Sequence, residues 1–503
     1  MILLLNIGHL TYFPKFWNMY SFGNVNISTI IYNIMKIVSV ISDPTVELEK
    51  LTVPDTDYST GTPVKTEDLD TLKYGYTSPL IKILGYIVPN ISYFKVVSGV
   101  DFLPSLTLTF TDLSSEFRNK YFPKDGDLLS LYIRSKNPDF KHIRGDYNIL
   151  TVKEYGSQIT ITAELRVEGI HIPTLKSYKE MSSFGVFKEV AKELGLGVSS
   201  NIEGDTQDKM TWICPLKSPY DFLSTDVLEH AYLGDDKYFT SSVDLHYFLN
   251  FIEPSSIHSD LTVKEMRKIT NILQTEDHHF GNGGKEDEGI LEEFFLSNHS
   301  YLLGTNKRII EVNLLNSSSS ISTSIGHRQI IFYYDKKEKK MQEFFHETIT
   351  SKDENAIILK GRKEDDYAKN IRYLNKQLQS ENVHKNYNFS ELGNRSNNRE
   401  NGKITLRVIL SGICTEVNLY QLVPILLFND GDSILNYGDD ALKGNGYSQE
   451  SINTLYSGNY MISGLGYEYN PSERPGIHTI LMCVKREFIK IAQDEKSGQS
   501  PKK

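Results

Sequence analysis

The sequence predicts a mainly β protein in which an α+β domain is inserted between two antiparallel β-barrels. Three observations carry this prediction. Short apolar segments with strand-like patterns fill two separated regions, 80–176 and 403–490. Residues 177–260, which lie between them, contain an amphipathic helix and the start of a well-capped second helix. The two β regions also present similar segments in the same order, which indicates an internal duplication.

The composition fits a globular chain of several domains. With 503 residues, of which 39% are hydrophobic, the chain has ample material for cores, and its 30 tyrosines favour β structure. The formal charge of −10, without a basic run interleaved with aromatic residues, argues against sequence-specific nucleic-acid binding. The three cysteines are far apart, which favours buried, reduced thiols over a disulfide frame or a zinc site. They are Cys214, Cys414 and Cys483.

Residues 1–42 are apolar in patches, but polar residues interrupt every stretch of about 20 residues, so stable membrane insertion is not expected. No basic residues precede Ile2-Leu3-Leu4-Leu5, which argues against a signal peptide. We interpret residues 1–42 as an N-terminal extension and leave the start of translation open. The candidate starts are Met1, Met19 and Met35. Residues 43–79, rich in proline, threonine and acidic residues, are expected to form an extended arm.

The first β region, residues 80–176, is expected to be antiparallel. In its third strand Leu106, Leu108 and Phe110 alternate with threonines, so one face should lie against a core. Tyr155-Gly156-Ser157 makes a hairpin turn that is too short for a parallel crossover. The expected strands are 81–88, 93–97, 106–111, 128–133, 147–152 and 158–165.

The inserted domain, residues 177–260, should begin with a helix at 183–194 that buries its phenylalanines and ends at Gly195-Leu196-Gly197. A strand at 210–213 contains Trp212. A closing hairpin is expected from 237–239 and 243–252.

The second helix of the insert has an unusually complete start. Ser218 is a favoured N-cap residue, Pro219 suits the first helical position, and Asp221 is placed to reach back to the cap amide. The aromatic residues around this start are most simply core residues.

The remaining chain divides by composition. Residues 261–350 are expected to form a β-rich connecting domain with a helix at 261–273, and 351–402 a polar, mostly exposed linker with a helix at 367–378. The tail, 491–503, is charged and expected to be disordered. The strands expected between 291 and 484 are 291–296, 308–315, 327–334, 342–348, 404–411, 421–428, 460–467 and 477–484.

Four segments of the first β region have counterparts in the second. The clearest is Gly145-Asp146-Tyr147-Asn148-Ile149, which matches Gly458-Asn459-Tyr460-Met461-Ile462. Two unrelated antiparallel sheets with ordinary alternation remain the alternative. If a chain with two similar barrels forms a trimer, six similar units surround one axis, and such a ring joins a six-fold object to a three-fold one.

No catalytic constellation stands out. Asp277-His278-His279 offers metal ligands, but no third ligand lies at a diagnostic spacing, so a solvated loop is favoured. His346-Glu347 lacks the second histidine of a zinc-protease helix, and neither a nucleophile elbow nor a phosphate loop occurs. A glycosidase-type carboxylate pair stays open. We expect no metal and no cofactor.

The ordered series of segments resembles the baseplate hub proteins of contractile-tailed bacteriophages, whose fold also forms the base of VgrG spike proteins. The resemblance covers roughly residues 80–489. The segments that carry it are Asp101–Leu108, Tyr121–Asp127, Phe187–Leu196, Asp208–Trp212, Ser218–Leu223, Asn298–Ser300, Gly304–Asn306, Asn382–Tyr387, Gly458–Ile462 and Val484–Phe488.

The resemblance implies a non-enzymatic structural subunit with two tube-like barrels. Three subunits would form a pseudo-six-fold ring that joins the hexameric tail tube to the trimeric central spike. It further implies contacts with the tape-measure protein and baseplate wedge proteins, a place in the virion tail baseplate, and host cytoplasm during assembly. The structural or interaction candidates are Trp212, Ser218, Pro219, Asp221, Tyr147 and Tyr460.

Two other functions remain open. One is a tail-associated enzyme that degrades cell-wall polymer with carboxylates hidden among the surface acids. The other is a receptor-binding tail protein whose tyrosine-rich strands contact glycan.

Overall fold

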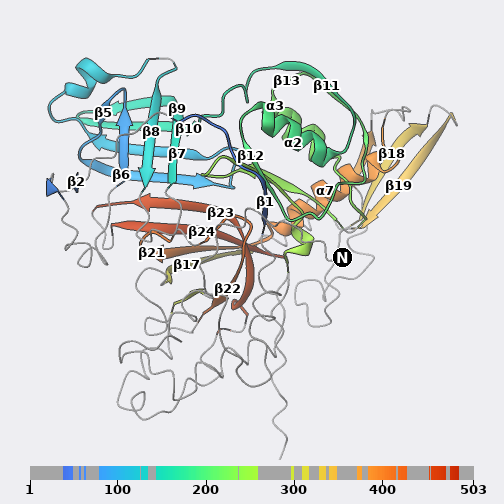
Figure 1. Ribbon diagram of the computed structural model, residues 1–503. Helices are drawn as coiled ribbons and strands as arrows, with labels where there is room; N and C mark the ends of the chain where they lie inside the picture. The colour runs from blue at the N-terminus through green and yellow to red at the C-terminus, as the bar shows by residue number, and fades with distance from the viewer. Residues whose placement is uncertain are drawn as a thin grey trace, which may run out of the picture.

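The fold is mainly β, as the sequence predicted, with an α+β block beside a large and mostly antiparallel sheet (Figure 1). The computed structural model describes residues 38–48, 56–57, 62–63, 79–124, 126–133, 143–235, 237–258, 296–298, 309–316, 328–335, 339–347, 371–375, 383–414, 417–427, 453, 455–471 and 476–486. Within these residues, no helix has both the length and the apolarity needed to cross a membrane. Most of the expected N-terminal extension, the helix at 261–273 and the C-terminal tail lie outside them.

The strands of the first β region follow the expected positions closely. They are β4 (Leu80–Ile83), β5 (Tyr86–Ile87), β6 (Ile91–Ser98), β7 (Ser105–Thr111), β8 (Leu128–Ile133), β9 (Ile143–Tyr155) and β10 (Gln158–Leu165), with the short π-helix η3 (Phe117–Tyr121) after β7. Their order in the sheet is β5-β4-β8-β9-β10-β7-β6, and every neighbouring pair is antiparallel. The strand expected at 81–88 is a hairpin instead, because Leu84 and Gly85 take φ angles of 49° and 84° and turn the chain back.

The second β region repeats this arrangement. Its strands are β16 (Leu296–Ser297), β17 (Ile309–Asn316), β21 (Ile404–Ser411), β22 (Leu422–Leu426), β23 (Gly458–Tyr469) and β24 (Ile477–Lys485). They are ordered β16-β22-β23-β24-β21-β17, which is the order β4-β8-β9-β10-β7-β6 of the first region, strand for strand in chain sequence. One pair differs in direction: β16 is parallel to β22, whereas β4 is antiparallel to β8. The expected duplication is therefore confirmed. We call β4 and β6–β10 copy 1, and β16, β17 and β21–β24 copy 2.

The shared glycine-tyrosine sequence occupies the same place in both copies. In each, the glycine and the tyrosine face two apolar residues of the neighbouring strand. The pairs are Gly145–Leu131 and Tyr147–Leu129 in copy 1, and Gly458–Ile425 and Tyr460–Val423 in copy 2. Both tyrosines are at most 1% exposed, so their equivalence includes burial in a core as well as strand position.

The copies meet edge to edge and form one sheet of 13 strands (Figure 1). The seam is the antiparallel pair of β6 and β23, from Ser98 opposite Leu465 to Phe94 opposite Tyr469. A side chain at Gly466 would place its Cβ 2.7 Å from the carbonyl oxygen of Val96, so the close approach at the seam depends on this glycine. The sequence did not predict this pairing.

The insert forms two layers around a helix. Its elements are β11 (Thr174–Met181), α2 (Ser183–Glu193), β12 (Gly197–Ser200), β13 (Met210–Lys217), α3 (Pro219–Asp221), η4 (Phe222–Val227), β14 (Thr240–Val243), β15 (Phe248–Ile252) and η5 (Pro254–Ser256). Helix α2, predicted within a residue, contacts both the β11–β13 ribbon and the sheet β1-β12-β15-β14. Two strands of that sheet were not predicted: β12, and β1 (Ser39–Ser42), which belongs to the expected N-terminal extension.

The connection between the copies differs from expectation at two places. Residues Ile371–Asn375 form strand β20, parallel to β18 (Arg328–Asp335), so the helix expected at 367–378 is wrong there. Tyr387–Asn401, within the expected exposed linker, form helix α7, and several of its side chains are buried. Strand β19 (Lys340–Glu347) pairs with β18, and β2 (Thr56–Asp57) pairs with β3 (Thr62–Pro63).

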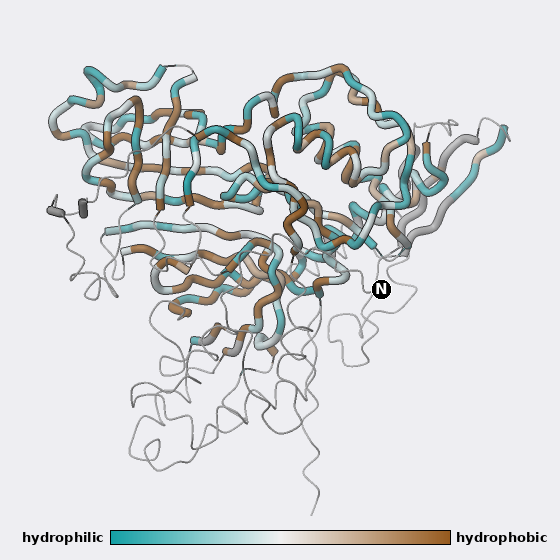
Figure 2. The backbone as a smooth tube through the Cα atoms, viewed as in Figure 1, coloured by the Kyte–Doolittle hydropathy of each residue, from teal (hydrophilic) through white to brown (hydrophobic). Residues whose placement is uncertain are grey.

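One hydrophobic core runs through both copies and the insert. The apolar residues, brown in Figure 2, are concentrated along the strands of copies 1 and 2. The insert is therefore packed as part of the same body, and its contacts with the two copies are the natural place to look for a functional arrangement.

Candidate functional site

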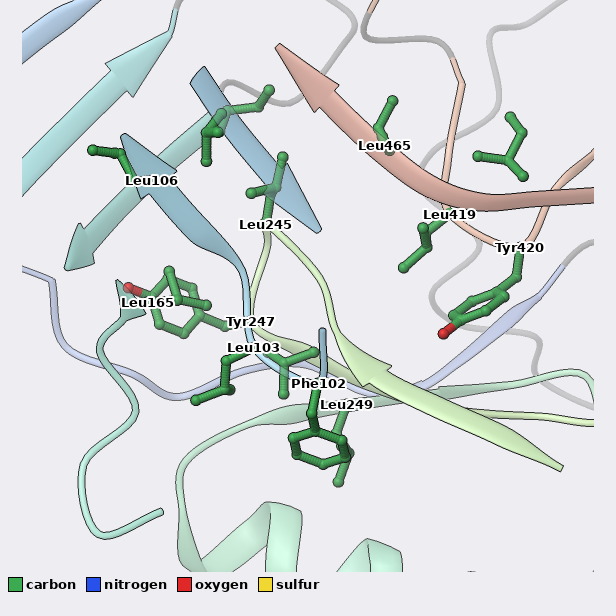
Figure 3. Packing of buried hydrophobic residues seen from close by; sticks show 14 of the residues in the cluster. Phe102, Leu103, Leu106, Leu165, Leu245, Tyr247, Leu249, Leu419, Tyr420 and Leu465 are labelled. Atoms are coloured by element: carbon green, nitrogen blue, oxygen red, sulfur yellow. The ribbon is translucent and has the colours of Figure 1, made fainter. Parts of the chain in front are cut away.

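Two tyrosines connect the insert to both copies (Figure 3). Tyr247, from the β14–β15 loop, reaches Asp146 of copy 1: its hydroxyl accepts from the amide nitrogen at 3.0 Å and lies 3.3 Å from the carbonyl oxygen. Tyr420, which precedes β22 of copy 2, shares a 2.8 Å hydrogen bond with the hydroxyl of Ser242 in the insert. We call Tyr247 and Tyr420 the brace tyrosines, since each joins the insert to one copy.

Both brace tyrosines take a backbone conformation that bulky residues avoid. Their φ angles are 65° and 63°, in the left-handed region, at a cost of order 1 kcal/mol or more each. In the insert, Asp244 supports the conformation by accepting hydrogen bonds from the amides of His246 (2.8 Å) and Phe248 (3.0 Å). Such a strained conformation persists where the surrounding structure fixes it, and here the packing on both sides of the loop fixes it.

Burial keeps the brace hydroxyls protonated. It raises the pKa of Tyr420 to about 12 and raises the pKa of Tyr247 well above its ordinary value. Both groups therefore remain hydrogen-bond donors across the neutral range. A third link has no side chain in it: the amide of Val243 donates to the carbonyl oxygen of Phe102 at 2.7 Å.

The predicted helix start is present and lies where the insert contacts copy 1. The Ser218 hydroxyl accepts from the Asp221 amide at 3.1 Å, and Pro219 is the first helical residue. Asp221 was expected to reach the cap amide, but its carboxylate instead accepts from the Ser218 hydroxyl at 2.7 Å. Tyr220, between Pro219 and Asp221, donates its amide N–H to the carbonyl oxygen of Ile170 at 3.1 Å, and its ring packs edge to face against the ring of Phe102. The cap thus positions an aromatic contact between insert and copy 1.

Trp212 is a buried packing residue of the β11–β13 ribbon. It is 2% exposed, lies opposite Tyr178 in the ladder, and donates its indole N–H to the carbonyl oxygen of Met181 at 2.9 Å. The six candidate residues therefore do not converge on one point. Tyr147 and Tyr460 lie in the cores of copies 1 and 2, while Trp212 and the Ser218 cap lie within the insert.

The described residues show no metal-binding cluster. They contain no cluster of three or more histidine, cysteine or acidic side chains placed to hold a metal ion. His346 and Glu347 belong to strand β19, which rules out a zinc-protease helix there, and the Asp277-His278-His279 loop lies outside the described residues. The three cysteines are free and buried, as predicted, and burial strongly raises the pKa of the Cys483 thiol, which disfavours its reactive thiolate.

Sequence reasoning missed the brace tyrosines and α7. The one local signal for Tyr247 is Asp244 three residues before it, a residue that favours tight turns. Tyr420 and the asparagines of α7 carry no such signal, because their partners lie more than 150 residues away in the chain.

Neither a family model nor a curated protein matches the chain. Solved structures with a similar course of the chain are tail proteins. A tail protein from Neisseria meningitidis is 8% identical with a TM-score of 0.45, covering 82% of this chain and 97% of its own. The 43 kDa tail protein of prophage MuSo2 from Shewanella oneidensis is 11% identical with a TM-score of 0.44, covering 81% and 98%.

A type VI secretion component of E. coli, described as similar to the bacteriophage T4 tail proteins gp27 and gp5, is 8% identical with a TM-score of 0.37, covering 82% and 78%. These proteins are described as tail proteins and as a type VI secretion component. A likeness this distant supports no functional conclusion, so the function is inferred from the repeated sheets and their brace.

Proposed function

We propose that this chain is a structural tail protein, a baseplate hub subunit without enzymatic activity. The observation that carries the proposal is the repeated strand order, β4-β8-β9-β10-β7-β6 and β16-β22-β23-β24-β21-β17, in one continuous sheet. A protein that needs two similar units in fixed relation gains from such a shared sheet and from an insert that ties both units together. The brace tyrosines supply those ties.

The proposed assembly is a homotrimer. Three chains with two similar units each present six similar units around one axis, so the ring matches a hexameric tail tube on one side and a trimeric central spike on the other. The sequence resemblance adds the tape-measure protein and the baseplate wedge proteins as further partners. The proposed location is the virion tail, after assembly in the host cytoplasm.

The oligomeric state tests this proposal directly. Native mass spectrometry of the full chain, alone and with the spike protein of the same particle, is expected to give three copies of this chain per spike trimer. A chain that stays monomeric in that complex would overturn the hub assignment. Immunogold labelling of assembled tails is expected to mark the baseplate end.

The competing enzyme hypothesis has its own test. The purified chain is expected to give no clearing in a peptidoglycan zymogram, with lysozyme as the positive control. Clearing that survives repurification would replace the structural proposal with that of a cell-wall-degrading tail enzyme. Binding to host cell-wall glycan, absent with unrelated glycans, would favour a receptor-binding role.

A further inference from the structure

Asparagine side chains of helix α7 form hydrogen bonds with backbone groups of the insert. Asn394 donates from Nδ2 to the carbonyl oxygens of residues 228, 229 and 231 at 2.8–3.1 Å and accepts from the amide of Phe239 at 3.2 Å. Asn398 donates to the carbonyl oxygen of Phe239 at 2.7 Å, and Asn401 accepts from the hydroxyl of Tyr238 at 3.3 Å. We call α7 together with residues 228–231 and 237–239 the α7 seam.

Two buried imidazoles lie at the N-terminal end of this seam. The ring of His230 stacks on the ring of Tyr387 with centroids 3.6 Å apart, and its Nδ1 donates to the Tyr387 carbonyl oxygen at 3.3 Å. His384 donates from Nε2 to the carbonyl oxygen of His230 at 3.1 Å, while its Nδ1 has no hydrogen-bond partner among the described residues. Each histidine is 8% exposed. This arrangement fits neutral imidazoles, since no group among the described residues accepts a hydrogen bond from an N–H at Nδ1 of His384.

The charges around His230 come from both sides of the seam. Arg395 of α7 lies nearby and pairs with Glu229 of the insert at 2.6 Å and with Glu391 of α7 at 3.0 Å. The pKa of His230 is lowered to about 3, chiefly by burial and also by the neighbouring His384 and Arg395, against the effect of the Tyr387 hydrogen bond. Burial raises the pKa of Glu391, so protonation of this carboxyl group on acidification favours the docked state, whereas protonation of the histidines opposes it.

His384 faces one acidic group, Asp208. Burial lowers the pKa of His384, although Asp208 acts to raise it. The Asp208 carboxylate already accepts from the Ser183 amide, the Thr206 hydroxyl and the Tyr232 amide at 2.8 Å each, so it is committed to the insert.

A third imidazole, the half-buried His258, lies at the opposite end of the seam. It is hydrogen-bonded to Asn401, and burial lowers its pKa to about 4, with Arg486 and Lys485 acting in the same direction. Both ends of the seam therefore depend on histidines that are neutral when α7 is docked.

We propose that the α7 seam is an acid-sensitive joint, at which α7 separates from the insert on acidification while both copies remain folded. In the docked state, a protonated His230 or His384 would be a buried cation next to Arg395 or without an acceptor at Nδ1. In the undocked state the same imidazoles are in water and titrate near their ordinary pKa of about 6.5. Docking is therefore at full strength above that pH and weakens as the pH falls below it.

Hydrogen exchange of the full chain tests the joint. Exchange measured by mass spectrometry at pH 7 and pH 5, corrected for intrinsic rates, reports the opening of the seam peptides. For each imidazole that stays neutral when docked, the opening equilibrium should rise about 25-fold over this interval. Peptides from β7 and β10, which contain no histidine, should keep their protection.

Matched variants separate the joint from general acid sensitivity. His230→Gln and His384→Gln remove one titration each, so each should reduce the pH dependence of the seam by up to about 25-fold, whatever it does to stability at pH 7. His171→Gln, at a half-exposed histidine 2.8 Å from Glu164, serves as the control and should leave the pH dependence of seam opening unchanged. Glu391→Gln removes the opposing carboxyl group and should steepen the response. Equal loss of protection in seam and β7–β10 peptides, or an unchanged pH response in both seam variants, would overturn the proposal.

Discussion

Copy 1 and copy 2 share a strand order but not an environment. In copy 1, strands β7 and β10 bury every second residue, and the intervening threonines are half-exposed. In copy 2, nearly every residue of β24, the counterpart of β10, is buried, whereas β21, the counterpart of β7, alternates over its first half and is then buried at three successive residues. The fold of a six-strand unit is thus compatible with one covered face or with two.

This difference shows that a duplicated sheet can keep its strand order while the burial and polarity of its outer face change. Copy 1 carries hydroxyl pairs on its open face, such as Thr109 with Thr160 at 3.1 Å. At the place of Thr160, copy 2 has Ile480, which lies opposite Ile409 and is 4% exposed. The outer face is therefore polar and open at this place in copy 1, and apolar and covered in copy 2.

The largest expected effect tests whether the two cores are equivalent. Tyr147→Ala and Tyr460→Ala should each lower the local free energy of unfolding by about 3–5 kcal/mol, because each empties a fully buried ring site. Tyr460→Ala should cost more, since Lys485 also lies 5.7 Å from the centre of that ring. Native-state hydrogen exchange of peptides from β9 and β23 measures both losses. A negligible loss at either tyrosine would contradict the equivalence.

The seam between the copies should respond next most strongly. Gly466→Ala places a Cβ 2.7 Å from the Val96 carbonyl oxygen, and displacing backbone costs about 1–3 kcal/mol. Exchange should increase in β6 and β23 together. Gly156→Ala is the control: its Cβ meets no atom within 4 Å, so only the local strain of its positive φ should appear, at the β9–β10 turn. Unchanged protection at the seam in Gly466→Ala would show that the ladder tolerates separation.

A pair of threonine variants compares the inner face of copy 2, where Thr479 takes the place of Ile159, with the open face of copy 1. Thr479→Val should destabilise copy 2 by about 1–2 kcal/mol, because the Thr479 hydroxyl accepts from the Cys414 amide and donates to the Gly412 carbonyl oxygen, both at 2.8 Å. Thr160→Val, on the open face of copy 1, should change stability by roughly 0.5 kcal/mol or less. Thermal unfolding and local exchange give the two values. Equal losses would mean that the open face of copy 1 is covered in solution.

The fold class was predictable because it depends on local pattern. Alternation in residues 106–111 and 404–411, the cap at Ser218 and the amphipathic helix at 183–193 are each set by neighbours in the chain. The duplication was also visible, since both copies kept the glycine-tyrosine sequence that fits one strand register.

The links between these parts were not predictable. The β6–β23 seam joins residues about 370 positions apart, and the sequence of neither strand indicates which strand it pairs with. Helix α7 reads as a polar linker because its contacts use asparagine side chains on backbone groups, a mode of burial that hydrophobic periodicity does not detect. Single-sequence patterns describe elements, whereas these contacts are properties of the assembled fold.

The smallest expected difference is between the two hydrogen-bonded contacts that join the insert to copy 1 and to copy 2. Tyr247→Phe removes both contacts to Asp146 and should cost about 1–2 kcal/mol, whereas Tyr420→Phe removes one bond to Ser242, whose hydroxyl can rotate, and should cost about 0.5–1.5 kcal/mol. Exchange of the β14–β15 loop and of β9 reports the first loss, and exchange of β14 and β22 the second. Since the brace tyrosines share no partner, the double variant should show additive losses; a coupling above about 0.5 kcal/mol would mean that the insert transmits strain from one copy to the other.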